Sequence, residues 1–235
     1  MLVFGIDTCG SAATAALLED DKLIAQTVIN SGRTHSQKMM PQIAEMFRQA
    51  EKEAEEVDCF AAAVGPGSFT GVRIGVATAK AMAQAVKKPC AAVSTLHGLA
   101  NNLAVFDGII CPILDARREQ VYNALFRGGR TLTRICEDRA LGIEELLAEL
   151  QEETLPIIFC GDGVPVFRER IVAELGENAC FAPIMQSMNL GASVAELGLA
   201  MMEAGKTVSY GELVPQYVRL SQAERERLEK ENRKG

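Results

Sequence analysis

The opening pattern of the chain returns in its second half, and this repeat constrains the fold more than any other feature. Residues 2–7 form an apolar run that ends in an aspartate, and an offset of 108 positions places that run on residues 110–115, which also end in an aspartate. The same offset places a turn at 20–22 on a second turn at 128–130. Repeats of this length determine architecture, because each copy folds as one supersecondary unit. The sequence therefore predicts two related units in one chain.

Short apolar runs separated by tight turns open the first unit. They cover residues 2–7, 12–18 and 23–29, a pattern that predicts three antiparallel strands in a meander. Apolar positions at three- and four-residue intervals then predict a helix over about 35–52, bent at Pro41. The remaining expected elements are a buried strand over 59–64, a sharp turn at 65–67, a helix over 70–86, a strand over 90–93 and a helix over about 95–106.

The second half repeats this order less regularly. After its own meander we expect a helix over 143–150, a strand over 156–160, and helices over 164–175 and 192–204. This order indicates an α/β protein of two lobes, each with a mixed sheet flanked by helices. We expect an N-terminal lobe at 1–106 and a less regular C-terminal lobe at 107–220. Residues 221–235 carry nine charges and are expected to form an exposed helix or tail.

The charge balance argues against a chain that binds nucleic acid by itself. There are 24 Lys and Arg against 31 Asp and Glu, a formal net charge of −7, whereas phosphate contacts need clustered basic side chains. The seven cysteines are dispersed in apolar runs, which is typical of core thiols in a reducing compartment. Met1 leads directly into an apolar strand, and no run is long enough to span a bilayer. We therefore expect a cytoplasmic protein without membrane association.

Two lobes that each open with a three-stranded meander and an aspartate resemble the actin-like ATPase and sugar kinase superfamily. The segment GPGSFTGVRIG at 65–75, together with residues 6–8 and 33–36, resembles the TsaB (YeaZ) family of tRNA threonylcarbamoyladenosine biosynthesis proteins. The resemblance covers the first half closely and the second half in architecture. It implies a partner of the catalytic subunit TsaD, a paralogue, that works with the ATPase TsaE in placing threonylcarbamoyl on the adenosine beside the tRNA anticodon.

The sequence offers few ligands for a metal ion. His35 and His97 are the only histidines, and neither has a second ligand at the four-residue spacing that would direct both side chains at one ion. TsaD proteins carry such a histidine pair in the stretch that resembles residues 93–100, where Thr95 and Leu99 stand in this chain. We expect no bound metal, and a structural role for His97.

A nucleotide site is expected only in part. In the superfamily the phosphates lie between two hairpin turns whose small residues expose backbone N–H groups. The first turn keeps that character in Asp7, Gly10 and Ser11, whereas the second, at 115–119, has no glycine and carries bulky charged groups. Residues 161–163 lie where an adenosine loop would be, but a strand-to-helix turn explains their glycines equally well. We expect no tightly held cofactor and at most weak ATP or ADP binding.

Two helix faces stand out as candidate partner surfaces. Four small residues repeat every four positions in the helix over 70–86, and its two glycines cost about 2 kcal/mol relative to alanine, so close approach by another element must offset that cost. That element is either a partner helix or the chain's own sheet. The helix over 35–52 carries a methionine-rich apolar stripe that can be core, partner surface or both. The candidate residues are Met39, Met40, Ile43, Met46, Phe47, Gly71, Gly75, Ala79 and Ala83.

The favoured hypothesis is a non-catalytic scaffold that dimerises with itself and exchanges that contact for a TsaD-type subunit, through the helices at 35–52 and 70–86. A TsaE-type ATPase would join the assembled complex, and tRNA would be reached only through it. The alternative is a small actin-like ATPase or kinase that uses Asp7 and Ser11. A peptidase is a weaker alternative, because Ser68 lacks the Gly-x-Ser-x-Gly spacing of a nucleophile elbow and no acid and base partners can be assigned.

Overall fold

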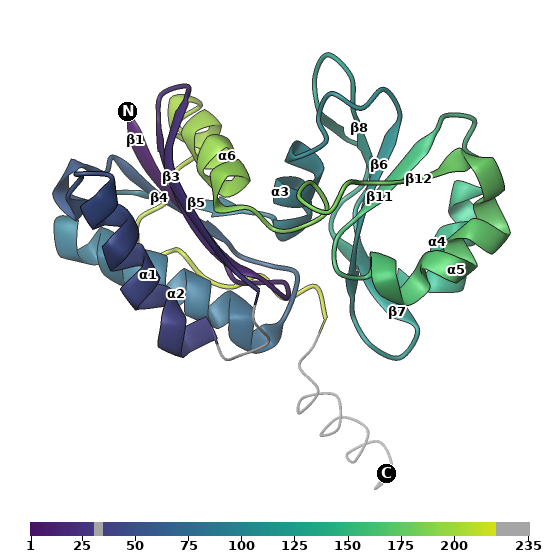
Figure 1. Ribbon diagram of the computed structural model, residues 1–235, viewed down its shortest axis with the longest axis horizontal. Helices are drawn as coiled ribbons and strands as arrows, with labels where there is room; N and C mark the ends of the chain where they lie inside the picture. Colours follow the sequence, from purple (N-terminus) through teal and green to yellow (C-terminus); the bar gives the residue numbers. More distant parts are fainter. Residues whose placement is uncertain (31–34, 220–235) are drawn as a thin grey trace, which may run out of the picture.

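The computed structural model describes residues 1–30 and 35–219, which form two lobes lying side by side (Figure 1). In spatial order the first sheet contains β3 (Lys22–Ile29), β2 (Ala13–Glu19), β1 (Leu2–Asp7), β4 (Cys59–Ala63) and β5 (Cys90–Val93). The second contains β10 (Arg139–Gly142), β7 (Gln120–Asn123), β6 (Ile109–Asp115), β11 (Ile157–Cys160) and β12 (Ala179–Phe181). In both, the central strand has an antiparallel neighbour on one side and a parallel one on the other. The predicted α/β class and the duplicated order are confirmed.

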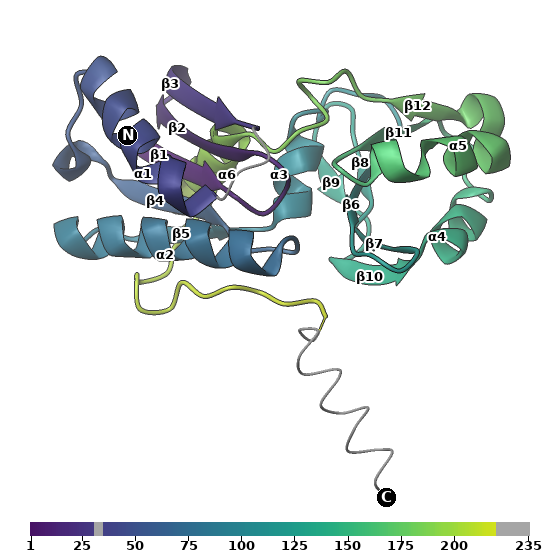
Figure 2. The same cartoon turned by 60° about the horizontal axis from the view of Figure 1, so that its bottom comes forward.

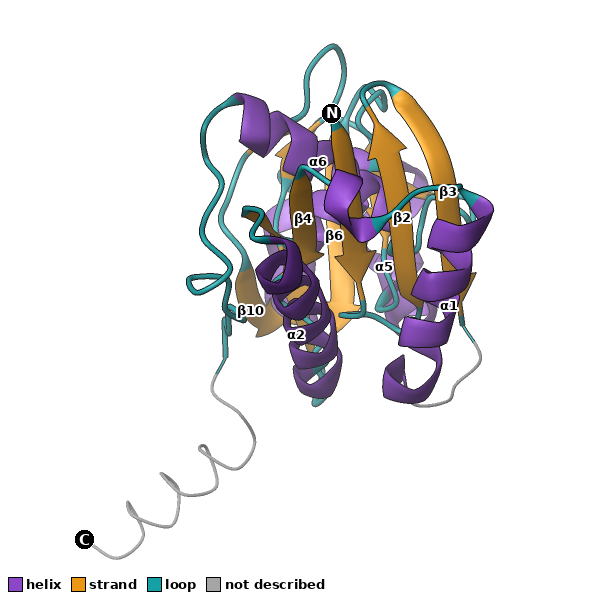
Figure 3. Cartoon of the chain, turned by 90° about the vertical axis from the view of Figure 1, so that its left-hand side faces the viewer, coloured by secondary structure: helices purple, strands orange, loops and turns teal. Residues whose placement is uncertain are grey.

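Helices cover both faces of the first sheet. On one face lie α1 (His35–Gln49) and α2 (Phe69–Val86), which are in front in Figure 3, and the short helix η1 (Ala54–Glu56) follows α1. The helix α1 ends three residues earlier than expected, and Glu51 just beyond it has a left-handed φ of 53°. On the opposite face lies α6 (Gly191–Glu203), which packs on β1, β4 and β2. The first sheet therefore lies between two layers of helix.

The position of α6 corrects the division of the chain at residue 106. A Cβ built on Gly5 would lie 2.3 Å from the carbonyl oxygen of Gly191, so α6 approaches β1 closely enough to require glycine there. Beyond α6, Val208 pairs with Cys90 at the edge of the first sheet. The last part of the described chain thus returns to the first lobe. The expected tail at 221–235 and the resembling residues Arg33 and Thr34 lie outside the described residues.

The second lobe is less regular because its meander is interrupted. Residues 113–115 of β6 pair with β7, residues 109–110 pair with β8 (Phe126–Arg127), and β8 pairs with β9 (Thr133–Arg134). The interruption lies opposite Pro112, which has no N–H to donate to a ladder. The side chain of Asn123 replaces the lost bonds by donating to the carbonyls of Pro112 and Ala124.

The helices of the second lobe enclose two cores. One core lies under α4 (Ile143–Leu150) and α5 (Val164–Leu175), the latter followed by η2 (Gly176–Asn178). The other lies under α3 (Thr95–Asn101), which is shorter than expected and packs on β6. The helix α3 therefore joins the lobes, although it precedes residue 106. No helix in the described ranges is long and apolar enough to cross a bilayer.

The small-residue face of α2 is turned inward. A Cβ built on Gly71 would lie 2.0 Å from the Thr8 carbonyl oxygen, and one on Gly75 would lie 2.7 Å from Thr8 Oγ1. The Thr8 hydroxyl also donates to the Gly71 carbonyl at 2.6 Å. Ala79 and Ala83 are fully buried in the first core. The expectation that these four residues form an open groove is corrected, since the chain's own sheet occupies that face.

The apolar stripe of α1 is also mostly core. Met39, Ile43, Met46 and Phe47 are buried, and Phe47 stacks against Phe4 with ring centroids 6.0 Å apart. Met40 is 48% exposed. The stripe therefore anchors α1 to its own sheet and leaves one methionine on the outer surface.

The packing of α2 predicts opposite effects for two helical glycine substitutions. Gly71→Ala should lower the free energy of unfolding by about 1–3 kcal/mol, because the new methyl group meets the Thr8 backbone. Gly98→Ala in α3 should raise it by up to about 1 kcal/mol, because its Cβ meets only Val194 Cγ2 at 3.7 Å and alanine favours a helix. Chemical denaturation of both variants measures this. Equal stability of the two would contradict the inward orientation.

Candidate functional site

A cleft of about 520 Å³ lies between the two lobes. One wall is the turn after β1 together with the start of α2, and the other is the turn after β6 together with the loop that precedes α5. The lining residues are Cys9, Gly10, Ser11, Gly67, Ser68, Leu114, Asp115, Ala116, Arg117, Tyr122, Asp162 and Val166. The expected hairpin turns therefore do face each other.

Asp7 lies behind this cleft and does not line it. Its carboxylate is buried and accepts two hydrogen bonds of 2.7 Å, from the backbone N–H of Cys9 and from the side-chain amide of Asn189. Burial raises the pKa of Asp7, although both hydrogen bonds act in the opposite direction. Asn189 is contributed by the segment that precedes α6. Asp7 thus ties the returning chain to the first turn, a structural role.

Gly10 and Ser11 differ in their access to the cleft. A Cβ built on Gly10 would lie 2.3 Å from Asn189 Oδ1, so any larger residue here would displace the buried Asn189 side chain that packs on the turn. Ser11 is exposed and lines the cleft. Of the three residues expected to bind nucleotide, Ser11 has the only side chain that can reach a ligand.

The second turn has an unusual backbone. Arg117, Arg118 and Glu119 have φ values of 64°, 55° and 58°, which are left-handed conformations that cost L residues on the order of 1 kcal/mol each. Asp115 stabilises the turn by accepting a 2.8 Å hydrogen bond from the Arg117 N–H and by pairing with its guanidinium at 2.9 Å. A phosphate-binding turn has glycines at such positions. This turn instead carries charged side chains that are exposed to solvent.

The loop at 161–163 is a tight turn that carries one polar side chain, the carboxylate of Asp162. Gly161 has a φ of 99°, and its Cβ would lie 2.3 Å from the Ile113 carbonyl oxygen, so packing explains this glycine. Asp162 accepts a 3.2 Å hydrogen bond from the Asp115 N–H, and burial raises the pKa of Asp162. Its carboxylate faces the same cleft as Asp115.

These residues do not fit a tightly held nucleoside triphosphate. Two carboxylates face the cleft, and the guanidinium of Arg117 is already paired with one of them. The second turn supplies no glycine backbone to approach phosphate oxygens. No group of three or more His, Cys, Asp or Glu side chains in the described part of the chain is arranged to hold a metal ion.

Thr95 and Leu99, which stand where TsaD proteins are expected to carry a histidine pair, have packing roles. Leu99 and Thr95 are fully buried in α3. His97 stacks on Phe126 with ring centroids 5.3 Å apart, and burial, followed by the charge of Arg134, lowers its pKa. The side chain of His35 lies outside the described part.

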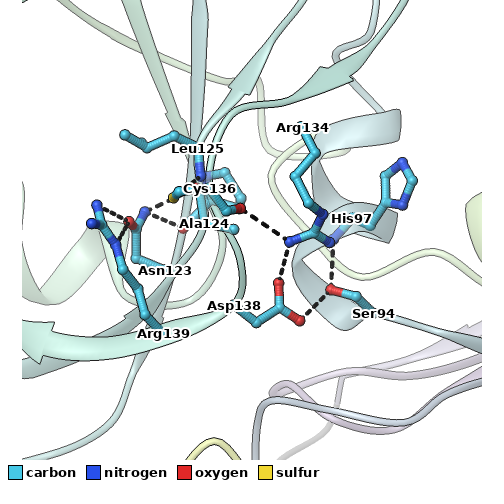
Figure 4. A network of polar contacts seen from close by, with 10 residues as sticks. Ser94, His97, Asn123, Ala124, Leu125, Arg134, Cys136, Asp138 and Arg139 are labelled. Carbon is cyan, nitrogen blue, oxygen red and sulfur yellow. Dashed lines mark hydrogen bonds and ion pairs between the residues drawn. The ribbon is translucent and has the colours of Figure 1, made fainter.

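A polar network near His97 joins the lobes (Figure 4). Ser94 accepts a hydrogen bond from the His97 N–H, which caps α3, and donates one of 2.6 Å to Asp138. Asp138 in turn pairs with Arg134 at 2.7 Å. Sequence reasoning missed both this network and Asn189, because their partners are 44 and 182 residues apart and no local pattern relates them.

Comparison with known proteins identifies the family. The sequence model of TsaD, tRNA N6-adenosine threonylcarbamoyltransferase, matches residues 22–227. The tRNA threonylcarbamoyladenosine biosynthesis protein TsaB of Bacillus subtilis (strain 168) is 33% identical over 230 residues, which cover 97% of this chain and 99% of that protein. The chain belongs to the TsaB family. A TsaB of Escherichia coli (strain K12) is 31% identical over 129 residues, 54% of this chain and 55% of that protein.

Solved structures show that this TsaB-family chain has the actin-like fold. YeaZ from Pseudomonas aeruginosa superposes with a TM-score of 0.74 at 21% identity, covering 92% of this chain and 99% of that one. The ROK hexokinase from Thermus thermophilus superposes with a TM-score of 0.51 at 10% identity, covering 87% and 100%. The resemblance to the TsaB family and the expected actin-like fold are confirmed. Ser68, considered above for a peptidase, caps α2 by accepting a hydrogen bond from the Gly71 N–H.

The environment of Asp7 predicts how this TsaB-family chain responds to substitution and pH. Asp7→Ala leaves the Cys9 N–H and the Asn189 amide without an acceptor and should lower the free energy of unfolding by about 2 kcal/mol or more. Asp7→Asn keeps an acceptor and should cost less. Because the pKa of Asp7 is raised on folding, its contribution to stability increases as pH falls through the folded pKa towards 3.8. Denaturation of parent and Asp7→Asn against pH measures this step, and an identical pH profile for both would contradict it.

Proposed function

We propose that this TsaB-family chain is a scaffold subunit, without catalysis of its own, that binds a TsaD-type catalytic subunit in the tRNA threonylcarbamoyladenosine machinery. The observation that carries the proposal is the outward face of α2. There Ala77, Ala81 and Ala85 recur every four residues and are all exposed. Small side chains along an exposed helix allow another helix to approach closely.

An apolar groove continues this surface towards α1. It has a volume of about 340 Å³ and lies beside the alanine face. Met40 and Met82 contribute flexible side chains that can adapt to more than one partner. The groove is lined by Met40, Ile43, Ala44, Phe47, Arg48, Lys52, Glu53, Ala54 and Met82. Of the residues expected at a partner surface, Met40, Ile43 and Phe47 therefore line this groove.

A single surface of this kind supports two competing partners. The alanine face and the groove suit a pair of helices, and both a second copy of this chain and a paralogous TsaD-type subunit can supply one. The homodimer and the heterodimer would then exclude each other. A TsaE-type ATPase and tRNA would join through the assembled complex, in the cytoplasm.

The cleft supports a non-catalytic role. Its second turn lacks a phosphate cradle, and Asp7 is engaged in holding Asn189. The exposed hydroxyl of Ser11 in a cleft of 520 Å³ favours the alternative, a small actin-like ATPase or kinase.

Substitutions on the outward face of α2 test the proposed surface. Ala81→Glu places a charge and a larger side chain between the helices and should give a folded monomer that no longer captures a TsaD-type subunit. Ala173→Glu is the matched control, since Ala173 is an exposed alanine of α5 in the other lobe. Light scattering measures self-association, and co-purification measures binding of the TsaD-type subunit. If Ala81→Glu retains both contacts, the surface lies elsewhere.

Aspartate substitutions of two methionines, one in the groove and one in the second lobe, test the groove. Met40→Asp should weaken self-association and TsaD binding together, by about 3 kcal/mol or more if the charge is buried unpaired in the contact. Met185→Asp, at a methionine of the second lobe that is 60% exposed, should change neither affinity. Loss of only one of the two contacts in Met40→Asp would show that the partners use different surfaces.

Nucleotide measurements separate the scaffold from the ATPase alternative. Calorimetry of the isolated chain with ATP and Mg²⁺ should show weak binding at most and no turnover. In a reconstituted tRNA modification assay, Asp7→Asn should support a rate close to that of the parent, because Asp7 holds Asn189 and lies outside the cleft lining. A complex that assembles with Asp7→Asn but no longer modifies tRNA would favour the ATPase.

A further inference from the structure

The last part of the described chain crosses the first lobe as an extended strap, defined here as residues 204–219. The strap leaves α6 and pairs with the edge of the first sheet, where Cys90 and Val208 exchange two backbone hydrogen bonds of 2.8 Å. It then runs alongside α2 towards the second lobe (Figure 2). Its path thus connects the outer edge of one lobe with the space between the two.

Two cations of α2 anchor the strap. Lys80 donates to the carbonyl oxygens of Gly211 and Leu213, at 3.1 and 3.5 Å. Arg73 donates from Nε to the Tyr217 hydroxyl at 2.8 Å. An aromatic stack completes this second anchor, because the rings of Phe69 and Tyr217 lie 4.7 Å apart and the Arg73 guanidinium lies 4.0 Å above the Phe69 ring.

The end of the strap contacts both sides of the cleft. On the first-lobe side, the Gln216 N–H donates to the Val64 carbonyl at 2.7 Å, just before the loop whose Gly67 lines the cleft. On the second-lobe side, Arg219 donates to the carbonyl of Ala116 at 3.0 Å, and Ala116 also lines the cleft. Gln216, which contacts the first lobe beside the cleft, and Arg219, which contacts the second, are therefore three positions apart in the chain.

The covalent connections between the lobes lie on the other side. The chain passes from one lobe to the other at α3 and again before α6, and Asn102 at the end of α3 links these two passages by donating to the Met188 carbonyl at 2.9 Å. In Figure 1 these passages lie above the centre, whereas the strap approaches the second lobe below it. Two lobes joined on one side can rotate about that side as a hinge. A contact on the opposite side restrains that rotation.

We propose that the strap is a clasp that fixes the separation of the cleft walls, with Arg73, Lys80 and Phe69 as its anchors and Arg219 as the link to the second lobe. Loss of the link should leave two restraints on rotation, the hinge side and the contact of the Ser11 backbone with Asp162 across the cleft. Helix α2 carries both the anchors of the clasp and the outward alanines. If a partner binds those alanines, as the proposed function requires, a movement of α2 on binding also moves the clasp. The clasp itself is testable in the isolated chain.

Electron paramagnetic resonance measurements of the distance between two spin labels test the clasp. Spin-labelled non-natural amino acids at Glu55 in η1 and Ala173 in α5, both exposed, report the separation of the lobes without use of the native thiols. Labelled chain is diluted in unlabelled chain, so only distances within one molecule contribute. The parent should give one narrow distance distribution. Arg219→Ala and Tyr217→Ala should each lose that narrow peak and give a broader distribution.

Arg118→Ala is the matched control, since this exposed arginine lies in the same turn as Ala116 but has no hydrogen-bonding or ionic partner among the described residues. It should keep the parental distribution. Tyr217→Phe, which keeps the aromatic stack and removes the hydroxyl, covers the case in which Tyr217→Ala does not fold and should broaden the peak less than Arg219→Ala. A parental distribution in folded Arg219→Ala would overturn the proposal, and so would equal broadening in Arg118→Ala.

Discussion

The close approach of α2 to the turn after β1 determines how the first lobe meets its surroundings. Thr8 lies so close to Gly71 and Gly75 that a side chain at either position would clash with it. The Thr8 hydroxyl also donates a hydrogen bond to the Gly71 carbonyl. This contact fixes the rotation of α2 about its axis. Ala79 and Ala83 then face the core, while Ala77, Ala81 and Ala85 face outward. The two glycines lower the intrinsic stability of the helix, and the close contact with Thr8 inside the lobe offsets that cost. The opposite face of the same helix, with its exposed alanines, is the proposed partner surface.

The two halves of the chain fold as repeats but are completed by each other. The first lobe takes α6 and residues 204–219 from the end of the described chain, and the second lobe takes α3 from the first half. Polar contacts fix these exchanges, since Asp7 binds Asn189 across 182 residues and Ser94 binds Asp138 across 44. A carboxylate that looks catalytic from its place at a strand end is thereby explained by the need to hold a returning segment.

The sequence predicts what depends on neighbouring residues and misses what depends on distant ones. The first meander, the helix over 70–86 and the duplicated strand order follow from runs, turns and periodicity, and all are present. Periodicity also shows that Gly71, Gly75, Ala79 and Ala83 share a face, but it does not say what that face meets. The outward alanines at 77, 81 and 85 have the same four-residue spacing and were a readable signal. Asn189 had none, because its partner is at the opposite end of the chain.

Hydrogen exchange on the chain with and without a saturating TsaD-type subunit tests whether α2 presents its alanine face to a partner while its glycine face holds the lobe together. We expect slower exchange of amides in residues 69–86 of α2 and unchanged exchange in α5, which lies in the other lobe. Slower exchange confined to α5 or to the turn at 115–119, with α2 unchanged, would contradict it.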